Sequence, residues 1–456
     1  DLRPFLMVPR RRSTPPPMPS LCPHPVRRRF ARWFPVAALL LAGTGCSGTG
    51  TESDPQPPAV PVIPEPPPAE PPVTEPAPAP ARILAIDTHS DTTQRMLDED
   101  ADLSQRLPDG HVDLVRMQEG GLGGVFLSIW VDPRKYRGER AWRRTLSLIG
   151  AVEELVRDHP EQAALCTTSA EVRAAFAAGK AAILMGVEGA HGLGTSDVEE
   201  ALDRTRQLYR RGVRYMTITW STDNDFGHSS TGREPQLGLT DAGRTLVTEL
   251  NTLGMIVDVS HVSDATFEDI LGLTTKPVLA SHSSCRDLAA HPRNVTDAMI
   301  QRIAANGGAV CLNFYAQFLD ATYRAGRRRV QRMHPDEFRT LQEEHTHYRP
   351  RATAGRTLAQ QLDPTLVYPT VERLADHIAH VVEVAGPGAA CLGSDFDGVG
   401  ELPAGMDDVA DLPVLRAALE ARRLPVAAVF GENVLRVLDA QRAGSPPPTP
   451  PSPTPE

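Results

Sequence analysis

The sequence predicts an α/β fold, a TIM-type (β/α)8 barrel, flanked by disordered tails at both ends of the chain. Three observations favour this fold. Eight short apolar runs recur between residues 83 and 393, and segments with helical spacing of apolar residues lie between most of them. The runs are apolar along most of their length, which is typical of parallel strands buried on both faces. Eight such units in one chain predict a closed barrel.

The strands and helices can be located from these patterns. The predicted strands are residues 83–88, 124–130, 182–187, 213–219, 255–259, 277–280, 309–314 and 390–393. Between the fourth and fifth strands, apolar residues at helical spacing follow Thr240 and stop at Gly254, which predicts a capped helix. The alternative fold is an open doubly wound sheet, but no glycine-rich phosphate loop follows the first strand.

One connection is much longer than the others. Residues 320–365 are rich in charged and helix-forming residues and separate the seventh strand from a helix that begins near Val371. We therefore expect a helical insertion. Because it follows the carboxyl end of a strand, it is a candidate lid, and a solvated insertion without a function is the alternative.

Composition limits the folded domain to residues 82–442. The chain has 43 prolines, concentrated in residues 55–80 and 446–455, so residues 47–81 are expected to be a disordered linker and residues 443–456 a disordered tail. The hydrophobic content of 41% is ample for a large core. A net charge of −10 without a long basic run in the globular part argues against nucleic acid or an anionic membrane surface as a partner.

Residues 1–46 have the plan of a secretory signal. Three arginines precede a short apolar run and small residues that end at Cys46. This run resembles the bacterial lipoprotein processing box, which implies lipidation of Cys46 and a location in the cell envelope or outside the cell, anchored to a bacterial membrane. Gly43 stands where that box usually has leucine, so plain secretion or an uncleaved anchor is the alternative. Because the printed chain begins with Asp1, Met7 or Met18 is a candidate start.

The other cysteines do not predict a disulfide framework. Cys311 and Cys391 lie inside apolar strand-like runs, where a buried free thiol is the usual arrangement. Cys22 lies in the signal region, and Cys166 and Cys285 have no clear structural setting in the sequence. We therefore expect no disulfide framework, although the predicted compartment would allow one.

Six side chains of the metal-ligand type lie at the carboxyl ends of the predicted strands. They are His89 and Asp91 after the first strand, Glu188 after the third, His261 after the fifth, His282 after the sixth and Asp395 after the eighth. Taken singly, each has a structural interpretation, such as a hydrogen-bonded pair, a helix cap or a core histidine. In a barrel, however, all these strand ends meet on one face. Burying six such groups without a cation would cost several kcal/mol each.

Imidazole and carboxylate ligands together favour divalent ions of the zinc type. Two ions need a bridging anion, and none of the chain's three lysines ends a strand, so Glu188 is the predicted bridge. The expected division gives one ion His89, Asp91 and Glu188, and the other Glu188, His261 and His282. A hydroxide shared by the ions would be the nucleophile, and Asp395 would hold and relay its proton.

Several segments, in this order, resemble the membrane dipeptidase (renal dipeptidase) family of M19-type zinc peptidases. They are Asp87–Asp91, Val187–Ala190, Arg214–Thr219, Asp258–His261, Ser281–Ser284, Arg293–Val295, Gly393–Val399 and Gly431–Val437. The resemblance covers nearly all of residues 83–440. It implies a barrel of the metal-dependent hydrolase kind, with two Zn2+ on His89, Asp91, Glu188, His261 and His282. It also implies a dipeptide substrate whose terminal carboxylate is bound by Arg293, with tolerance of a D-residue at that end. A homodimer is a candidate assembly.

One position departs from the family pattern. Members similar to the mammalian enzyme have a histidine directly after the Tyr-x-Thr-x-Thr strand, and this chain has Trp220. An indole donates one hydrogen bond but cannot accept a proton. Trp220 is therefore expected to shape the substrate pocket. The alternative is that His228, at the end of a loop that looks flexible, takes the place of the family histidine.

The sequence thus predicts a metallo-dipeptidase in which Glu188 and Asp395 serve catalysis and Arg293, Asp395 and Trp220 contact the substrate. One zinc ion would polarise the peptide carbonyl, and Asp395 would carry the proton of the attacking hydroxide to the leaving amine. Two other functions stay open. Trp220 would allow an amidohydrolase that acts on a non-peptide amide or lactone. A non-catalytic binding lipoprotein is the third hypothesis, against which the complete ligand set argues.

Overall fold

The computed structural model describes residues 82–344 and 348–442. The predicted signal region, Cys46, the proline-rich linker and the carboxyl-terminal tail lie outside the described residues. Within the described part, no helix has the length and apolar character needed to cross a membrane.

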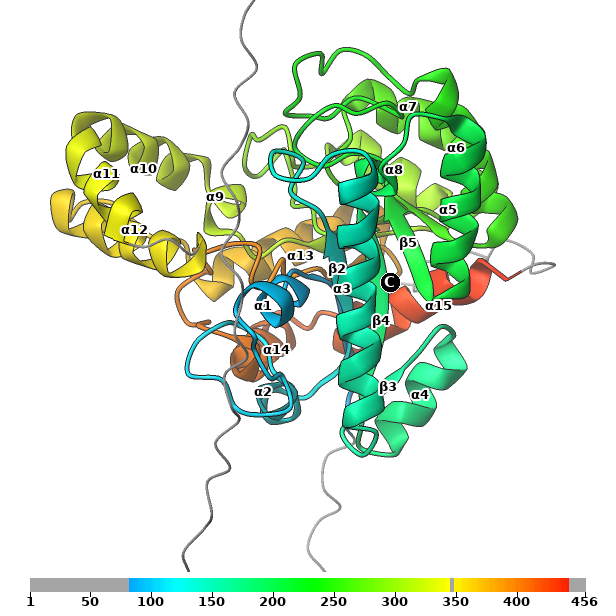
Figure 1. Cartoon of the computed structure of the whole chain (residues 1–456). Helices are drawn as coiled ribbons and strands as arrows, with labels where there is room; N and C mark the ends of the chain where they lie inside the picture. The colour runs from blue at the N-terminus through cyan, green and yellow to red at the C-terminus, as the bar shows by residue number, and fades with distance from the viewer. Residues whose placement is uncertain (1–81, 345–347, 443–456) are drawn as a thin grey trace, which may run out of the picture. The chain divides into compact units, whose positions relative to one another are not determined.

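Eight parallel strands close into a barrel, which confirms the predicted (β/α)8 fold (Figure 1). They are β1 (Ala85–Ser90), β2 (Leu122–Trp130), β4 (Ala181–Glu188), β5 (Val213–Thr217), β6 (Ile256–Asp258), β7 (Leu279–Ala280), β8 (Ala309–Leu312) and β9 (Ala390–Leu392). Strand β1 pairs with β2 on one side and with β9 on the other, and this second pairing closes the ring. Each of the eight predicted apolar runs overlaps one of these strands, although β1, β2 and β4 extend one or more residues beyond the predicted limits.

A further strand, β3 (Ala163–Leu165), was not predicted. It pairs with the first residues of β4. Strand β5 pairs with the same edge of β4 further along, from Met185 onward. Two of its three residues are partly exposed. A segment so short and so weakly buried has no clear periodicity in the sequence.

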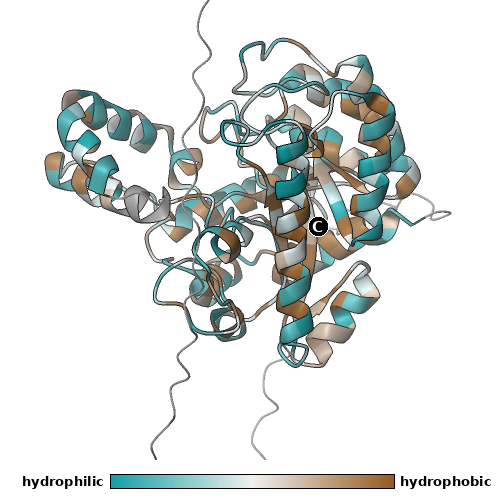
Figure 2. Cartoon of the chain, in the orientation of Figure 1, coloured by the Kyte–Doolittle hydropathy of each residue, from teal (hydrophilic) through white to brown (hydrophobic). Residues whose placement is uncertain are grey.

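Helices lie around the barrel, and most of them cover the outer face of its strands. They are α1 (Thr93–Asp98), α2 (Leu114–Gly120), α3 (Glu139–Asp158), α4 (Ser169–Ala177), α5 (Val198–Arg210), α6 (Asp241–Leu253), α7 (Asp264–Leu273), α8 (Asp297–Ala305), α9 (Ala316–Leu319), α13 (Val371–Ala385), α14 (Leu412–Ala421) and α15 (Asn433–Ala440). Figure 2 shows apolar residues along the strands and on the helix sides that face them. In α6 the predicted caps are present: the Thr240 side chain accepts a hydrogen bond from the Gly243 amide, and Gly254 is left-handed with φ of 73°.

Three helices occupy the segment where an insertion is predicted. They are α10 (Ala321–Met333), α11 (Pro335–Glu344) and α12 (Tyr348–Leu362). They stand out from the barrel in Figure 1 and share a small core of Val330, Phe338 and Ala359. The buried carboxylate of Glu401 joins this unit to the barrel, 3.1 Å from the guanidinium of Arg327. A lid function for these helices stays a prediction.

The barrel interior is apolar toward the amino ends of the strands. Its core includes Ile86, Phe126, Leu184, Tyr215 and Ile256, and the same cluster contains four residues of α15, Val434, Leu435, Val437 and Leu438. Helix α15 therefore closes the barrel at the end opposite the carboxyl ends of the strands. The polar residues of the barrel interior lie at the other end, at the carboxyl ends of the strands, together with the predicted ligands.

Cys311 and Cys391 form a disulfide bond inside this core, so the expectation of two free thiols is wrong. The two residues are register partners on the adjacent strands β8 and β9, with Cα atoms 4.1 Å apart. Register partners on parallel strands project from the same face of the sheet, which brings the two sulfur atoms together. Cys166 and Cys285, which had no clear setting in the sequence, are free and buried.

Candidate metal centre

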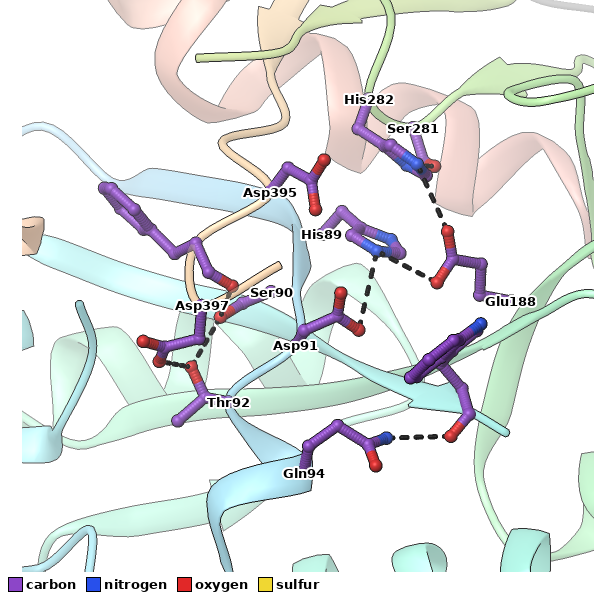
Figure 3. Close-up of polar contacts among 12 residues, drawn as sticks. His89, Ser90, Asp91, Thr92, Gln94, Glu188, Ser281, His282, Asp395 and Asp397 are labelled. Atoms are coloured by element: carbon purple, nitrogen blue, oxygen red, sulfur yellow. Dashed lines mark hydrogen bonds and ion pairs between the residues drawn. The ribbon is translucent and has the colours of Figure 1, made fainter. Parts of the chain in front are cut away.

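The predicted ligands converge at the carboxyl ends of the strands. Glu188 lies at the centre: its Oε1 is 2.8 Å from Nε2 of His261 and 3.4 Å from Nε2 of His282. Its Oε2 is 3.7 Å from Nε2 of His89, and that nitrogen is 4.0 Å from Oδ1 of Asp91. Figure 3 shows His89, Asp91, Glu188, His282 and Asp395 directed toward one another. Residues up to 306 positions apart in the chain, His89 and Asp395, thus form one cluster.

Local irregularities of the backbone aim these side chains. Between Asp87 and Ser90, β1 has one residue more than the facing part of β2, and this bulge contains His89. His261 and Asp395 have left-handed backbones, with φ of 68° and 63°. Such conformations cost roughly 1–3 kcal/mol for residues other than glycine and cluster at functional sites. These two backbone conformations therefore lower the stability of the folded protein somewhat, and they direct the two side chains into the site.

Hydrogen bonds behind the cluster orient two of the histidines. The Ser281 hydroxyl donates to Oδ2 of Asp258 at 2.7 Å, so it accepts from Nδ1–H of His282, also at 2.7 Å. The proton on Nδ1 leaves the lone pair of His282 on Nε2, which faces Glu188. Nδ1 of His89 is in turn 2.7 Å from the hydroxyl of Tyr215. Both rings therefore present Nε2 to the centre of the site.

The cluster fits a divalent metal ion. Nε2 of His89, Nε2 of His282 and Oδ1 of Asp91 are buried without a hydrogen-bond partner among the described residues. Burial lowers the pKa of His89 to about 3, so its ring is neutral at pH 7. Burial, and next the charge of Asp395, raises the pKa of Asp91 to about 8, and burial also raises the pKa of Glu188 well above its usual value. A cation would satisfy the free lone pairs and stabilise the ionised carboxylates.

Asp395 lies beside the ligands. His89, Asp91 and Asp395 each offer a ligand atom, all within 4.8 Å of one another. Oδ2 of Asp395 accepts a hydrogen bond of 2.9 Å from the side-chain amide of Asn313. Burial raises the pKa of Asp395 to about 6, against the lowering effect of that hydrogen bond. A Cβ at Gly398 would lie 2.2 Å from Oδ1 of Asp395 and 2.3 Å from Oδ2 of Asp91, so a side chain there would displace the two carboxylates.

The sequence analysis missed the residues that orient the ligands. Asn313 directly follows β8, and Asp258 and Tyr215 lie in β6 and β5. A polar residue near the carboxyl end of a predicted barrel strand can indicate a place in the functional site. Asn313 and Asp258 both have such a position and could have been found in this way. Tyr215 could not be found in this way, since a tyrosine within an apolar strand is an ordinary core residue.

Arg293 is buried at the same face of the barrel. Its Nη2 donates a hydrogen bond of 3.3 Å to the carbonyl oxygen of His282, and its Nη1 is buried without a partner among the described residues. Burial lowers its pKa to about 10, although the carboxylates of Asp395 and Glu188 oppose this shift. The guanidinium is therefore charged at neutral pH and keeps a buried donor, Nη1, that is available to a ligand.

Trp220 and His228 have different surroundings. The Trp220 ring packs against Trp130, with ring centroids 5.0 Å apart. Nδ1 of His228 is 2.7 Å from the carbonyl oxygen of Gly238, and its loop is held by Asp223, whose Oδ1 accepts from the Ser229 amide at 2.8 Å. The loop that looked flexible in the sequence thus has many hydrogen bonds, and one ring nitrogen of His228 is already used. These contacts favour Trp220 as the pocket residue.

A (β/α)8 barrel whose strand ends bring histidines and carboxylates into one buried cluster is the architecture of a metal-dependent hydrolase. The family model described as membrane dipeptidase (peptidase family M19) matches residues 79–446. The chain therefore belongs to the membrane dipeptidase family, and it is a metallo-dipeptidase by class.

Individual relatives agree with this assignment. The chain is 32% identical to dipeptidase verJ of Clonostachys rogersoniana over 343 residues, which is 72% of this chain and 76% of that protein. It is similar to the crystal structure of dipeptidase AC, a metallopeptidase of family M19, with a TM-score of 0.64 and 28% identity over 79% of this chain and 99% of that chain. A metallopeptidase from Rhodobacter sphaeroides, crystallised with a phosphinate mimic of the dipeptide L-Ala-D-Ala, has a TM-score of 0.64 and 27% identity, covering 79% of this chain and 100% of that chain.

Proposed function

We propose that this protein hydrolyses dipeptides with the help of two zinc ions, held by His89, Asp91 and Glu188 on one side and by Glu188, His261 and His282 on the other. The observation that carries the proposal is the central place of Glu188. One of its oxygens faces His261 and His282, and the other faces His89. A carboxylate with its two oxygens directed to two groups of ligands is suited to bridge two ions.

Bound in this cluster, the ions would supply Lewis acidity and a water molecule activated at neutral pH. Asp395 lies where it could accept a proton and later pass it to the leaving amine, because its Oδ1 borders Gly398 together with Oδ2 of Asp91. Asn313 binds only the other oxygen of Asp395, so one oxygen stays available for proton transfer. We propose Asp395 as the general acid and base on this arrangement.

Arg293 would bind the free carboxylate of the substrate. Its Nη1 has no partner in the part of the chain that the structure describes, and its buried position favours a strong, charge-assisted hydrogen bond to an anion. If the enzyme requires a free carboxylate one residue beyond the scissile bond, it cleaves only short peptides. The phosphinate mimic of L-Ala-D-Ala bound by the R. sphaeroides relative supports tolerance of a D-residue at the carboxyl-terminal position.

We also propose that Cys46 carries a lipid and that the enzyme is held on a bacterial membrane, facing the cell envelope or the exterior. Support for this comes from the sequence of residues 1–46 alone. A homodimer is proposed on the family resemblance. Mass spectrometry of the membrane-extracted chain would detect the lipid on Cys46. Recovery of the Cys46→Ser variant in the soluble fraction, without the lipid mass, would support the anchor.

The test of the catalytic proposal measures zinc content together with hydrolysis of L-Ala-D-Ala and L-Ala-L-Ala. The wild-type domain is compared with Glu188→Gln and with Glu154→Gln, a matched change at an exposed position on α3. We expect two zinc ions per chain and turnover in the wild type and the control. In Glu188→Gln we expect loss of zinc and of at least 99% of the activity, roughly the effect of removing a group that acts in the transition state.

The other outcomes separate the alternatives. Two zinc ions without cleavage of any dipeptide would support the metal site and refute the substrate, which would direct attention to non-peptide amides or lactones. Zinc binding without hydrolysis of dipeptides, N-acyl amino acids or lactones would favour a binding protein. Full activity in Glu188→Gln would refute the bridging role of this residue.

A further inference from the structure

Two tryptophans form a wall at the mouth of the barrel, next to the metal centre. Trp130 is the last residue of β2, and Trp220 follows β5. Their ring centroids are 5.0 Å apart and the rings are inclined by 52°. Both side chains are only partly buried, so the pair retains surface that a ligand can contact.

The register of the sheet places Trp130 beside Glu188. The two residues are direct partners in the parallel pair β2 and β4, and such partners project from the same face of a sheet. Four residues earlier, the partners Phe126 and Leu184 both belong to the core inside the barrel. Because side chains alternate along a strand, Trp130 also points inward, at the level of the metal ligands. Its Nε1–H is buried and has no hydrogen-bond partner among the described residues.

Trp220 is held against the same part of the rim. A Cβ on Gly189, the residue after Glu188, would lie 3.4 Å from Cβ of Trp220. The guanidinium of Arg134 lies 5.8 Å from the Trp220 ring and is itself paired with Asp132, at 2.8 and 2.9 Å. Since Asp132 neutralises Arg134, the wall offers an aromatic surface rather than a charged one.

The order of the strands places Trp130, and with it the Trp220 ring that it contacts, across the barrel from Arg293. Around the barrel the order is β1, β2, β4, β5, β6, β7, β8 and β9, so β2 and β7 are four positions apart in a ring of eight. Arg293 lies on the segment after β7, and Trp130 ends β2. A dipeptide whose carboxylate is bound by Arg293 and whose peptide bond lies at the metal centre therefore directs its amino-terminal residue toward the tryptophans.

We infer that Trp130 and Trp220 form the subsite for the side chain of the amino-terminal residue and select large apolar, above all aromatic, side chains. The inference rests on the proposed dipeptidase function. Two rings that meet at an angle offer both stacked and edge-to-face contacts to a third ring. A methyl side chain would leave most of this apolar surface in contact with water.

The experiment compares kcat/KM for L-Phe-L-Ala and L-Ala-L-Ala, two substrates that differ only at the amino-terminal side chain. We expect the wild-type ratio to favour phenylalanine by about 10-fold or more, the range that pocket contacts of this size give. The ratio should fall several-fold in Trp130→Leu and in Trp220→Leu. It should be largely kept in Trp220→Phe, which retains a ring. Trp142→Phe, a change on the outer helix α3, is the matched control and should leave the ratio unchanged.

The ratio of two substrates cancels any general loss of active enzyme in a variant. A wild-type ratio near one, or a ratio that both leucine variants leave unchanged, would overturn the inference while dipeptide cleavage itself upholds the proposed function. If no dipeptide is cleaved, the proposed function fails, and binding of the same two dipeptides to the zinc-loaded protein, measured by titration calorimetry, decides the inference. Tighter binding of L-Phe-L-Ala that is lost in Trp130→Leu would support the subsite, and equal binding would refute it.

Discussion

The hydroxyl of Tyr215 lies 2.7 Å from Nδ1 of His89, and both residues are fully buried. A Cβ on Gly186, the register partner of Tyr215, would lie 2.0 Å from the phenol ring. The glycine therefore leaves the space that the phenol ring fills beneath the metal centre. Through this contact, a residue of the barrel core determines how a predicted metal ligand is oriented.

The Tyr215→Phe variant should bind zinc more weakly, because the His89 ring loses the hydrogen bond that orients it. Changes of this kind weaken metal binding by about 10- to 100-fold. Competition with a chromogenic chelator measures the affinity. Tyr209→Phe, on helix α5, is the control and should bind zinc like the wild type. An unchanged affinity in Tyr215→Phe would show that packing alone orients His89.

The Arg293→Lys variant should lose the ability to bind the substrate carboxylate without losing zinc. A charge-assisted hydrogen bond contributes about 1.5–3 kcal/mol, so kcat/KM for a dipeptide should fall roughly 10- to 150-fold. The dipeptide amide, which has no carboxylate, should be affected much less. Arg286→Lys is the control, since Arg286 is paired with Asp264 at 2.7 and 2.8 Å. Equal losses for dipeptide and amide would argue against carboxylate binding by Arg293.

The stability of the protein should fall on acidification partly because of His377. This ring is buried, accepts a hydrogen bond from the Cys285 amide and donates one to the carbonyl of Leu319. Burial lowers its pKa from 6.5 to about 4. Because the folded pKa lies below the unfolded one, the stabilisation is complete above about pH 6.5 and is lost as the pH falls to 4, by at most about 3 kcal/mol.

Urea denaturation at several pH values tests this prediction on the wild type and His377→Gln. Subtraction of the two stability curves removes effects common to both proteins, including loss of metal at low pH. The wild type should lose more stability than the variant between pH 6.5 and pH 4. Parallel curves would show that His377 does not contribute to the acid sensitivity.

Removal of the Cys311–Cys391 disulfide should destabilise the protein. The bond closes a loop with a sequence separation of 80 residues, and disulfides typically stabilise by about 2–4 kcal/mol. The double variant Cys311→Ala and Cys391→Ala should unfold at a lower urea concentration than the wild type. A Cys166→Ala change, at a free buried cysteine, separates this effect from the loss of a buried sulfur. Addition of reductant should leave the double variant unaffected.

Much of the metal centre was predictable from the sequence because all strands of this barrel run in the same direction. His89, Glu188, His282 and Asp395 each lie at the carboxyl end of an apolar run, and in a parallel barrel these ends share one face. Convergence of the ligands thus follows from the order of strands and helices, without knowledge of any distance. The departure at Trp220 was also visible, but its partner Trp130 looked like an ordinary strand residue.

Local patterns of apolar residues determined the strands, the helix caps of α6 and the approximate place of each ligand, because burial and capping depend on neighbours in the sequence. Closure of the barrel decided the rest. It paired Cys311 with Cys391, brought Tyr215 and the Asp258–Ser281 pair behind the histidines, and set Trp130 against Trp220 and opposite the β7 side. These contacts join residues that are distant in the chain, and strand register alone makes them neighbours.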